Sequence, residues 1–126
     1  MTTVSQARIT LIGLTEELDI KGKHSGRYYI YFDGKARDVL GLMLDRLGYE
    51  GVPAEHDRCR KQGSNAPGRS PYVVASKLLG ISTRDLGAIW QEIDCPPSTN
   101  KSIRAKIFQV LGMVDDTPLA AHPASP

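Results

Sequence analysis

The chain has 126 residues, enough for one compact domain that buries a core without metal or disulfide staples. Its composition is 40% hydrophobic and 24% charged, and no apolar run approaches the roughly 18 residues of a helix that crosses a bilayer, so we expect no membrane-spanning helix. The net charge of +2 is too small to indicate a nucleic-acid partner by itself, so the distribution of the charges matters more than their sum.

The first ten residues, MTTVSQARIT, lack the basic segment and the long apolar segment of a secretory signal. We therefore expect a cytoplasmic protein. Cys59 and Cys95 are the two cysteines of the chain, and in a cytoplasmic protein we expect both to be free thiols.

The N-terminal part predicts a flexible leader over residues 1–6, followed over residues 7–50 by a pair of strands and a helix. Residues 7–14 (ARITLIGL) have the nearly continuous, β-branched apolar character of a buried strand. Residues 27–32 (RYYIYF) predict a second strand, which pairs with the first as a hairpin around residues 21–26, and Tyr29 and Tyr31 on one face form a surface for a partner. A short helix that starts at Thr15 is a competing interpretation of LTEEL.

An amphipathic helix follows, because apolar residues recur at helical spacing up to Gly48. Asp33 is its expected N-cap. The apolar stripe consists of Ala36, Val39, Leu40, Met43, Leu44 and Leu47. The side that we expect to face solvent consists of Arg37, Asp38, Asp45 and Arg46.

Residues 51–71 predict a basic loop or hinge, because the hydrophobic periodicity disappears and Gly, Pro, Ser and Asn accumulate there. Two interpretations of its cations stay open: they grip phosphate, or they keep a hinge solvated. The cations are Arg58, Arg60, Lys61 and Arg69.

The segment Val73 to Ile93 has two apolar helical stretches around a glycine. Ser76 stands four positions before Gly80, Leu86 follows that glycine by six positions, and Ile89 by nine. A small residue lets two helices approach, glycine accepts the turn, and the later aliphatic residues lock the second helix onto the first. This spacing resembles the helix-turn-helix of bacterial and phage regulators over about twenty residues.

Ser82 and Asp85 approximate a capping box, so the second helix is expected to run from about Thr83 to Ile93. The resemblance implies that this helix enters the major groove of DNA, with Arg84 and Gln91 bonding base edges or phosphates. Its outward positions would be Thr83, Arg84, Gly87, Ala88 and Gln91. Two packed helices that never touch DNA remain the other interpretation.

Residues 72–114 as a whole predict a helical unit that contains this pair. A further helix starts near Asn100, with Lys101, Arg104 and Lys106 beside an apolar face of Ile103, Ile107, Val110 and Leu111. Lys101 and Arg104 are candidate contacts to the DNA backbone. Trp90 is expected in the core. Residues 115–126 predict a disordered tail.

Catalytic and metal chemistry find little support in the residues. His56 and Cys59 are three positions apart, and His24 and Cys95 could complete four zinc ligands, but the paired spacing of a structural zinc site is missing. The basic residues around Cys59 could lower the pKa of its thiol, but no partner base is evident. The acidic cluster Glu16, Glu17 and Asp19 is typical of a solvated edge. We therefore expect no enzyme, no metal site and no cofactor.

Together these patterns predict an α+β protein. The resemblance implies a DNA-binding transcription regulator of bacterial or phage type that binds double-stranded DNA, and, by analogy with the two-fold sites of such regulators, a homodimer formed through the N-terminal part. The DNA-binding residues would be Arg58, Arg60, Lys61, Arg69, Thr83, Arg84, Gln91, Lys101 and Arg104. The alternative is a non-enzymatic inhibitor or adaptor that binds a protein partner through the aromatic strand and the apolar helix faces.

Overall fold

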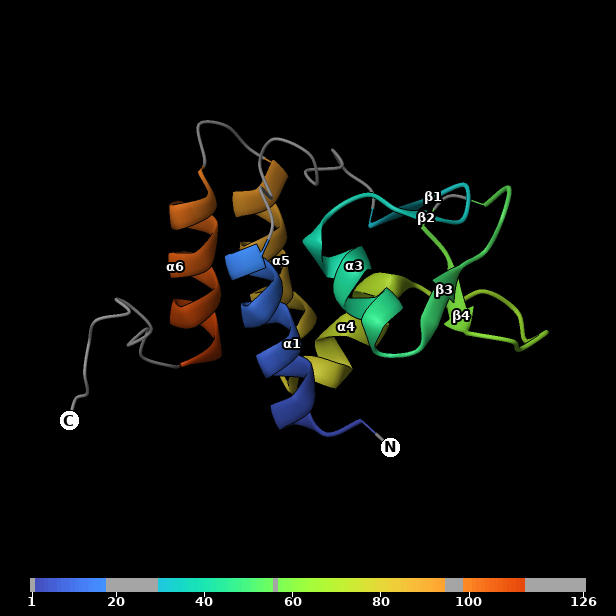
Figure 1. The fold of residues 1–126 in the computed structure, drawn as a ribbon, viewed down its shortest axis with the longest axis horizontal. Helices are drawn as coiled ribbons and strands as arrows, with labels where there is room; N and C mark the ends of the chain where they lie inside the picture. Colours follow the sequence, from blue (N-terminus) through green and yellow to red (C-terminus); the bar gives the residue numbers. More distant parts are fainter. Residues whose placement is uncertain (1, 18–29, 56, 95–98, 113–126) are drawn as a thin grey trace.

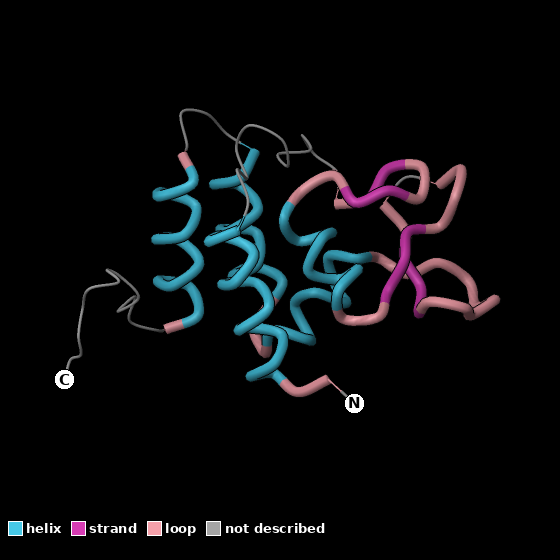
Figure 2. The backbone as a smooth tube through the Cα atoms, in the orientation of Figure 1, coloured by secondary structure: helices cyan, strands magenta, loops and turns pink. Residues whose placement is uncertain are grey.

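The computed structural model describes residues 2–17, 30–55, 57–94 and 99–112. Within them five helices and two antiparallel two-stranded sheets confirm the predicted α+β class (Figures 1 and 2). The helices are α1 (Val4–Glu17), α3 (Val39–Arg46), α4 (Pro71–Leu79), α5 (Thr83–Asp94) and α6 (Asn100–Leu111). The strands are β1 (Tyr31–Phe32), β2 (Lys35–Ala36), β3 (Tyr49–Gly51) and β4 (Cys59–Lys61). No helix in these described ranges is long and apolar enough to cross a membrane.

The first element is a helix, so the predicted strand over residues 7–14 is wrong. Its buried residues Ala7, Leu11 and Leu14 follow a helical spacing, whereas Ile9 on another side is 68% exposed. The helix already begins inside the predicted leader, because Thr3 and Gln6 form a capping box: each side chain accepts the other's backbone N–H, at 3.1 and 2.9 Å. The competing helix from Thr15 is also wrong, since Thr15 lies in the last turn of α1.

The aromatic strand pairs forward along the chain. Tyr31 lies opposite Ala36 across a turn at Asp33 and Gly34, whose positive φ angles of 52° and 81° suit a tight hairpin. Tyr31 is fully buried, which corrects its predicted place on a partner surface. Its hydroxyl donates to the Asp45 carboxylate at 2.7 Å. Tyr29 and the predicted turn at residues 21–26 lie outside the described residues.

Helix α3 carries the predicted apolar stripe but starts later than expected. Its N-cap is Asp38, whose carboxylate accepts the Gly41 N–H at 3.0 Å, whereas Asp33 belongs to the preceding turn. Asp38 is therefore buried, not solvated as predicted. The buried stripe consists of Val39, Leu40, Met43 and Leu44.

The predicted loop over residues 51–71 begins inside a hairpin, because it starts at the last residue of β3 and includes all of β4. Strand β3 pairs with β4, Glu50 facing Arg60, and the backbone of Arg69 pairs with Cys59 on the other side of β4 at 2.8 and 2.9 Å. Strands of three residues are too short to show a period-2 pattern, which explains why the sequence predicts a loop. The Asp57 carboxylate links this hairpin to β1 by accepting the N–H groups of Ile30 and Tyr31 at 2.8 and 3.0 Å.

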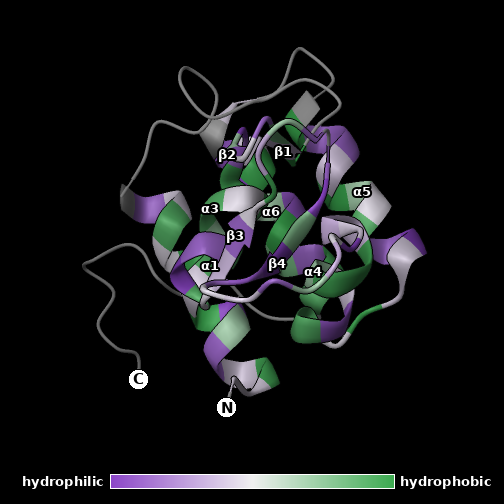
Figure 3. Ribbon diagram, turned by 90° about the vertical axis from the view of Figure 1, so that its right-hand side faces the viewer, coloured by the Kyte–Doolittle hydropathy of each residue, from purple (hydrophilic) through white to green (hydrophobic). Residues whose placement is uncertain are grey.

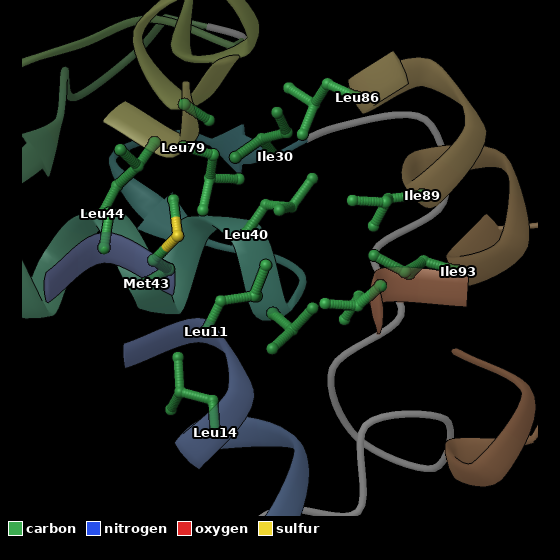
Figure 4. Packing of buried hydrophobic residues seen from close by; sticks show 14 of the residues in the cluster. Leu11, Leu14, Ile30, Leu40, Met43, Leu44, Leu79, Leu86, Ile89 and Ile93 are labelled. Atoms are coloured by element: carbon green, nitrogen blue, oxygen red, sulfur yellow. The ribbon is translucent and has the colours of Figure 1, made fainter. Parts of the chain in front are cut away.

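One hydrophobic core joins the helices (Figure 4). Side chains from α1, α3, α4 and α5 meet there, and α6 closes the core from beyond α5 (Figure 1). The hairpins lie at the far end from α6, and hydrophilic residues run along β3 and β4 (Figure 3). The largest fully buried side chains are Leu11, Leu14, Ile30, Tyr31, Leu40, Met43, Leu44, Leu79, Leu86, Ile89 and Ile93.

Candidate nucleic-acid interface

Helices α4 and α5 are joined by a short turn, as the sequence predicts. Helix α4 ends at Gly80, which adopts the left-handed conformation (φ 70°, ψ 33°) and donates its N–H to the carbonyls of Lys77 and Ser76. Ser82 begins α5, because its hydroxyl accepts the Asp85 N–H at 3.1 Å. Both helix ends adjoining the turn are thus capped by local contacts.

Packing on both sides fixes this turn. Ser76 of α4 is buried, and its hydroxyl donates to the Val73 carbonyl at 2.9 Å. Helix α1 covers the turn from outside: Arg8 donates to the Leu79 carbonyl at 3.0 Å, and Val4 would lie 3.1 Å from a Cβ added to Gly80. The turn between α4 and α5 is therefore held by α1 as well as by the two helices that it joins.

The outer side of α5 carries most of the positions that are predicted to face outward from this helix. Thr83, Arg84 and Gln91 are exposed and Ala88 is half-buried, while Leu86, Ile89 and Ile93 lie on the opposite side in the core. Asp85 is also exposed and brings a negative charge to the first turn. One side of α5 is thus free to meet a ligand.

Gly87 does not face outward as predicted, because Tyr72 of α4 reaches over it. A Cβ added to Gly87 would lie 2.6 Å from the Tyr72 hydroxyl oxygen, too close for any real side chain. The Tyr72 ring in turn meets Trp90 edge to face, with ring centres 6.1 Å apart. Trp90 packs against the core as predicted. Gly87 is thus the residue that allows α4 to bring its tyrosine onto α5.

The cations of the hairpin have different surroundings. Arg60 forms an ion pair with Glu50 at 2.9 Å, so its charge is largely neutralised. Arg58 and Lys61 are exposed, and among the contacts described the Arg58 guanidinium donates only to the Asp57 carbonyl, at 3.3 Å. Arg69 is exposed directly before Ser70, the N-cap of α4. Arg69 therefore lies at the beginning of α4.

The cations of α6 also divide into two groups. Arg104 bonds the Thr15 hydroxyl at 2.7 Å and the Glu16 carboxylate at 3.1 Å, with its guanidinium 5.0 Å from the centre of the Phe108 ring. The Arg104 side chain is only 15% exposed and connects α6 to α1, so its predicted contact with the DNA backbone is not favoured. Lys101 remains exposed.

The sequence places Lys106 beside the apolar face of α6 but does not indicate that it lies next to α5. It lines a hollow of about 250 Å³ between α5 and α6 together with Ala88, Gln91 and Glu92. Lys106 comes two positions after Arg104, which places the two on different sides of α6. This spacing is the one signal that could have separated them.

The Cys59 thiol is buried, and burial raises its pKa to about 11 although the nearby Arg69 charge opposes that shift. The lowered pKa that its basic neighbours suggest is therefore wrong. In the described residues no three metal-binding side chains come together. His24, His56 and Cys95, the other zinc candidates, lie outside the described residues.

The cations of the hairpin and those of α6 lie at opposite ends of the molecule, with α4 and α5 between them (Figure 1). The structure brings Arg69 to α4 and Lys106 to α5, but it does not gather the predicted DNA-binding residues into one patch. Comparison of the chain with protein-family models, with curated proteins and with solved structures finds no match.

Proposed function

We propose that this chain is a small cytoplasmic transcription regulator that binds double-stranded DNA through α4 and α5. One observation carries the proposal: a tight, doubly capped turn joins two helices, and the second helix buries one side and exposes hydrogen-bonding side chains on the other. This is the arrangement by which a helix-turn-helix inserts its second helix into the major groove.

The exposed side of α5 has a chemistry suited to base edges. Arg84, Ala88 and Gln91 are spaced i, i+4 and i+7, so they form one stripe. At a rise of 1.5 Å per residue the stripe spans about 10 Å, or about three base pairs. Arginine pairs with guanine, glutamine with adenine, and alanine contacts a thymine methyl group. The stripe therefore supports sequence readout along one short half-site.

Cations on both flanks of α5 support backbone binding. Arg69 adjoins the start of α4, and Lys101 and Lys106 belong to the neighbouring α6. DNA lying along α5 would present phosphates toward both groups. Arg60 and Arg104 contribute to this proposal only through their long-range field, since both are held by carboxylates.

A protein-interaction module is the second candidate, and a different surface supports it. Ile9 of α1 is 68% exposed beside a shallow hollow of about 510 Å³. Exposed aliphatic residues next to a hollow are typical of protein interfaces, including those between two copies of one chain. The hollow is lined by Thr2, Gln6, Ile9, Thr10, Arg46, Leu47 and Gly48.

Fluorescence anisotropy with a random-sequence duplex at two salt concentrations tests the DNA proposal. We expect binding that weakens steeply as salt rises, because each phosphate contact releases counterions. Arg84→Ala should weaken binding by roughly tenfold to a hundredfold on a selected site. Arg37→Ala is the matched control, since it removes the same charge from an exposed position outside the helix pair. Salt-independent binding, or equal effects of the two variants, would contradict the proposal.

A further inference from the structure

We propose that Tyr72 is a DNA-binding residue that donates a hydrogen bond from its hydroxyl to a backbone phosphate, from the place that Gly87 leaves open on α5. The inference rests on the proposed function. It adds a contact that the sequence does not indicate, because Tyr72 lies in α4, fifteen positions before Gly87.

The first support is the close approach of the tyrosine to the second helix. The hydroxyl oxygen would lie 2.6 Å from a Cβ at position 87, so it occupies the space that any other residue would fill. Gly87 is three residues after Arg84 and four before Gln91, and residues at these spacings are neighbours on a helix surface. The Tyr72 hydroxyl therefore sits beside the stripe that is proposed to face the bases.

The second observation is that the Tyr72 ring is held in place while its hydroxyl remains available as a hydrogen-bond donor. The ring packs edge to face against Trp90, at an interplanar angle of 86°. Within the described residues the Tyr72 hydroxyl has no hydrogen-bond partner, although Tyr72 is half-buried. Burial also raises the pKa of the phenol above its ordinary value, so the hydroxyl keeps its proton at neutral pH.

The position favours a phosphate over a base edge. The hydroxyl lies on the flank of α5 that faces α4, and the first helix of such a pair crosses the DNA backbone. Hydroxyl groups, including that of tyrosine, are common donors to phosphate oxygens. Its fixed ring would set how deeply α5 enters the groove, while the stripe of Arg84 and Gln91 distinguishes the bases.

Tyr72→Phe tests the inference because it removes the hydroxyl and keeps the ring against Trp90. We expect affinity to fall about fivefold to thirtyfold on every duplex, with unchanged base preference and unchanged thermal stability. A set of duplexes with one phosphate at a time replaced by a neutral methylphosphonate locates the contact. One replacement should weaken the wild-type chain and have no further effect on Tyr72→Phe.

Gly87→Ala provides a second variant that acts through the same hydroxyl. A methyl group there displaces the phenol, so binding should fall, although alanine favours the helix by about 1 kcal/mol. Gly13→Ala is the matched control, because it is also a helical glycine but nothing lies within 4 Å of its added Cβ. It should leave binding unchanged.

The outcomes separate the inference from the proposed function. If the wild-type chain binds no duplex, both fail. If it binds and Tyr72→Phe matches it on every methylphosphonate duplex, the inference alone is overturned. A change in base preference with Tyr72→Phe would also overturn it, since it would place the hydroxyl on a base.

Discussion

The helical region from α4 to α6 and the hairpin region (the two sheets and the turns that join their strands) keep their shapes by different contacts. The helices are set by local caps, such as Ser82 for α5 and the Thr99 and Ser102 capping box of α6. The hairpins depend on side chains distant in sequence, above all Asp57, which bonds the backbone of Ile30 and Tyr31. We infer that single polar substitutions cost more stability in the hairpins than in the helices.

Asp57→Ala should cause the largest loss of stability. It leaves two backbone N–H groups at the start of β1 without their acceptor and puts alanine where φ is 53°, so we expect a loss of about 3 kcal/mol. Chemical denaturation measures the loss. Asp57→Asn is the control, because asparagine keeps an acceptor oxygen and tolerates positive φ. Equal losses for both variants would show that the hydrogen bonds are not the cause.

Gly80→Ala should cost about 1 to 2 kcal/mol by the same measurement, because φ is 70° and the added Cβ would press on Val4 at 3.1 Å. Gly112→Ala at the end of α6 has the same φ of 70° but nothing within 4 Å of its Cβ. The difference between the two variants isolates the packing of α1 on the turn. A smaller loss for Gly80→Ala than for Gly112→Ala would contradict that packing.

Arg104→Ala should destabilise the fold by about 1 kcal/mol, since the guanidinium ties α6 to α1 through two oxygens and the Phe108 ring. Lys101→Ala removes an exposed charge from the same helix, so thermal unfolding should hardly change. The order should reverse in DNA binding, where Lys101→Ala weakens affinity more. If Lys101→Ala is the more destabilising change, the assignment of roles is wrong.

The smallest expected effect is a dependence of stability on pH that comes from Cys59. Burial raises the pKa of its thiol to about 11 from an ordinary value of 9.0. The raised value means that the folded chain holds this proton longer than the unfolded chain. Its contribution to stability is therefore present below pH 9 and is lost as pH rises toward 11. In a Cys95→Ser background, alkylation of Cys59 should be slow at pH 8 and accelerate on denaturation. Rapid alkylation of the native chain would show an accessible thiolate.

Local signals explain which elements can be predicted from the sequence. Ser82 predicts helix α5, and the apolar spacing after the prolines predicts α6. Helix α1 escapes prediction although Thr3 and Gln6 form a local capping box, because the β-branched residues of the apolar run after it favour a strand. The turn between β1 and β2 carries a local signal in Asp33 and Gly34, a pair typical of tight hairpins. The hairpin of β3 and β4 carries no comparable signal, and Asp57 joins it to β1 from more than 25 positions away.

In the candidate site, too, features set by local spacing can be predicted from the sequence, and features set by distant contacts cannot. Exposure of Arg84 and Gln91 follows from helical spacing within α5. The role of Gly87 depends on Tyr72, and the position of Arg104 depends on Glu16 in the first helix. Neither contact leaves a pattern within a short window, so a single sequence does not show which cation is free and which is held.

The bond between Arg8 and the Leu79 carbonyl has a consequence for engineering. A fragment from Ser70 to Gly112 holds α4, α5 and α6, yet it lacks the residues of α1 that support the turn and fill the core. The segment that resembles a regulator motif is thus smaller than the unit that can fold. Transplanting its twenty residues onto another scaffold would transfer the side chains of α5 without the contacts from α1 that hold the turn before this helix.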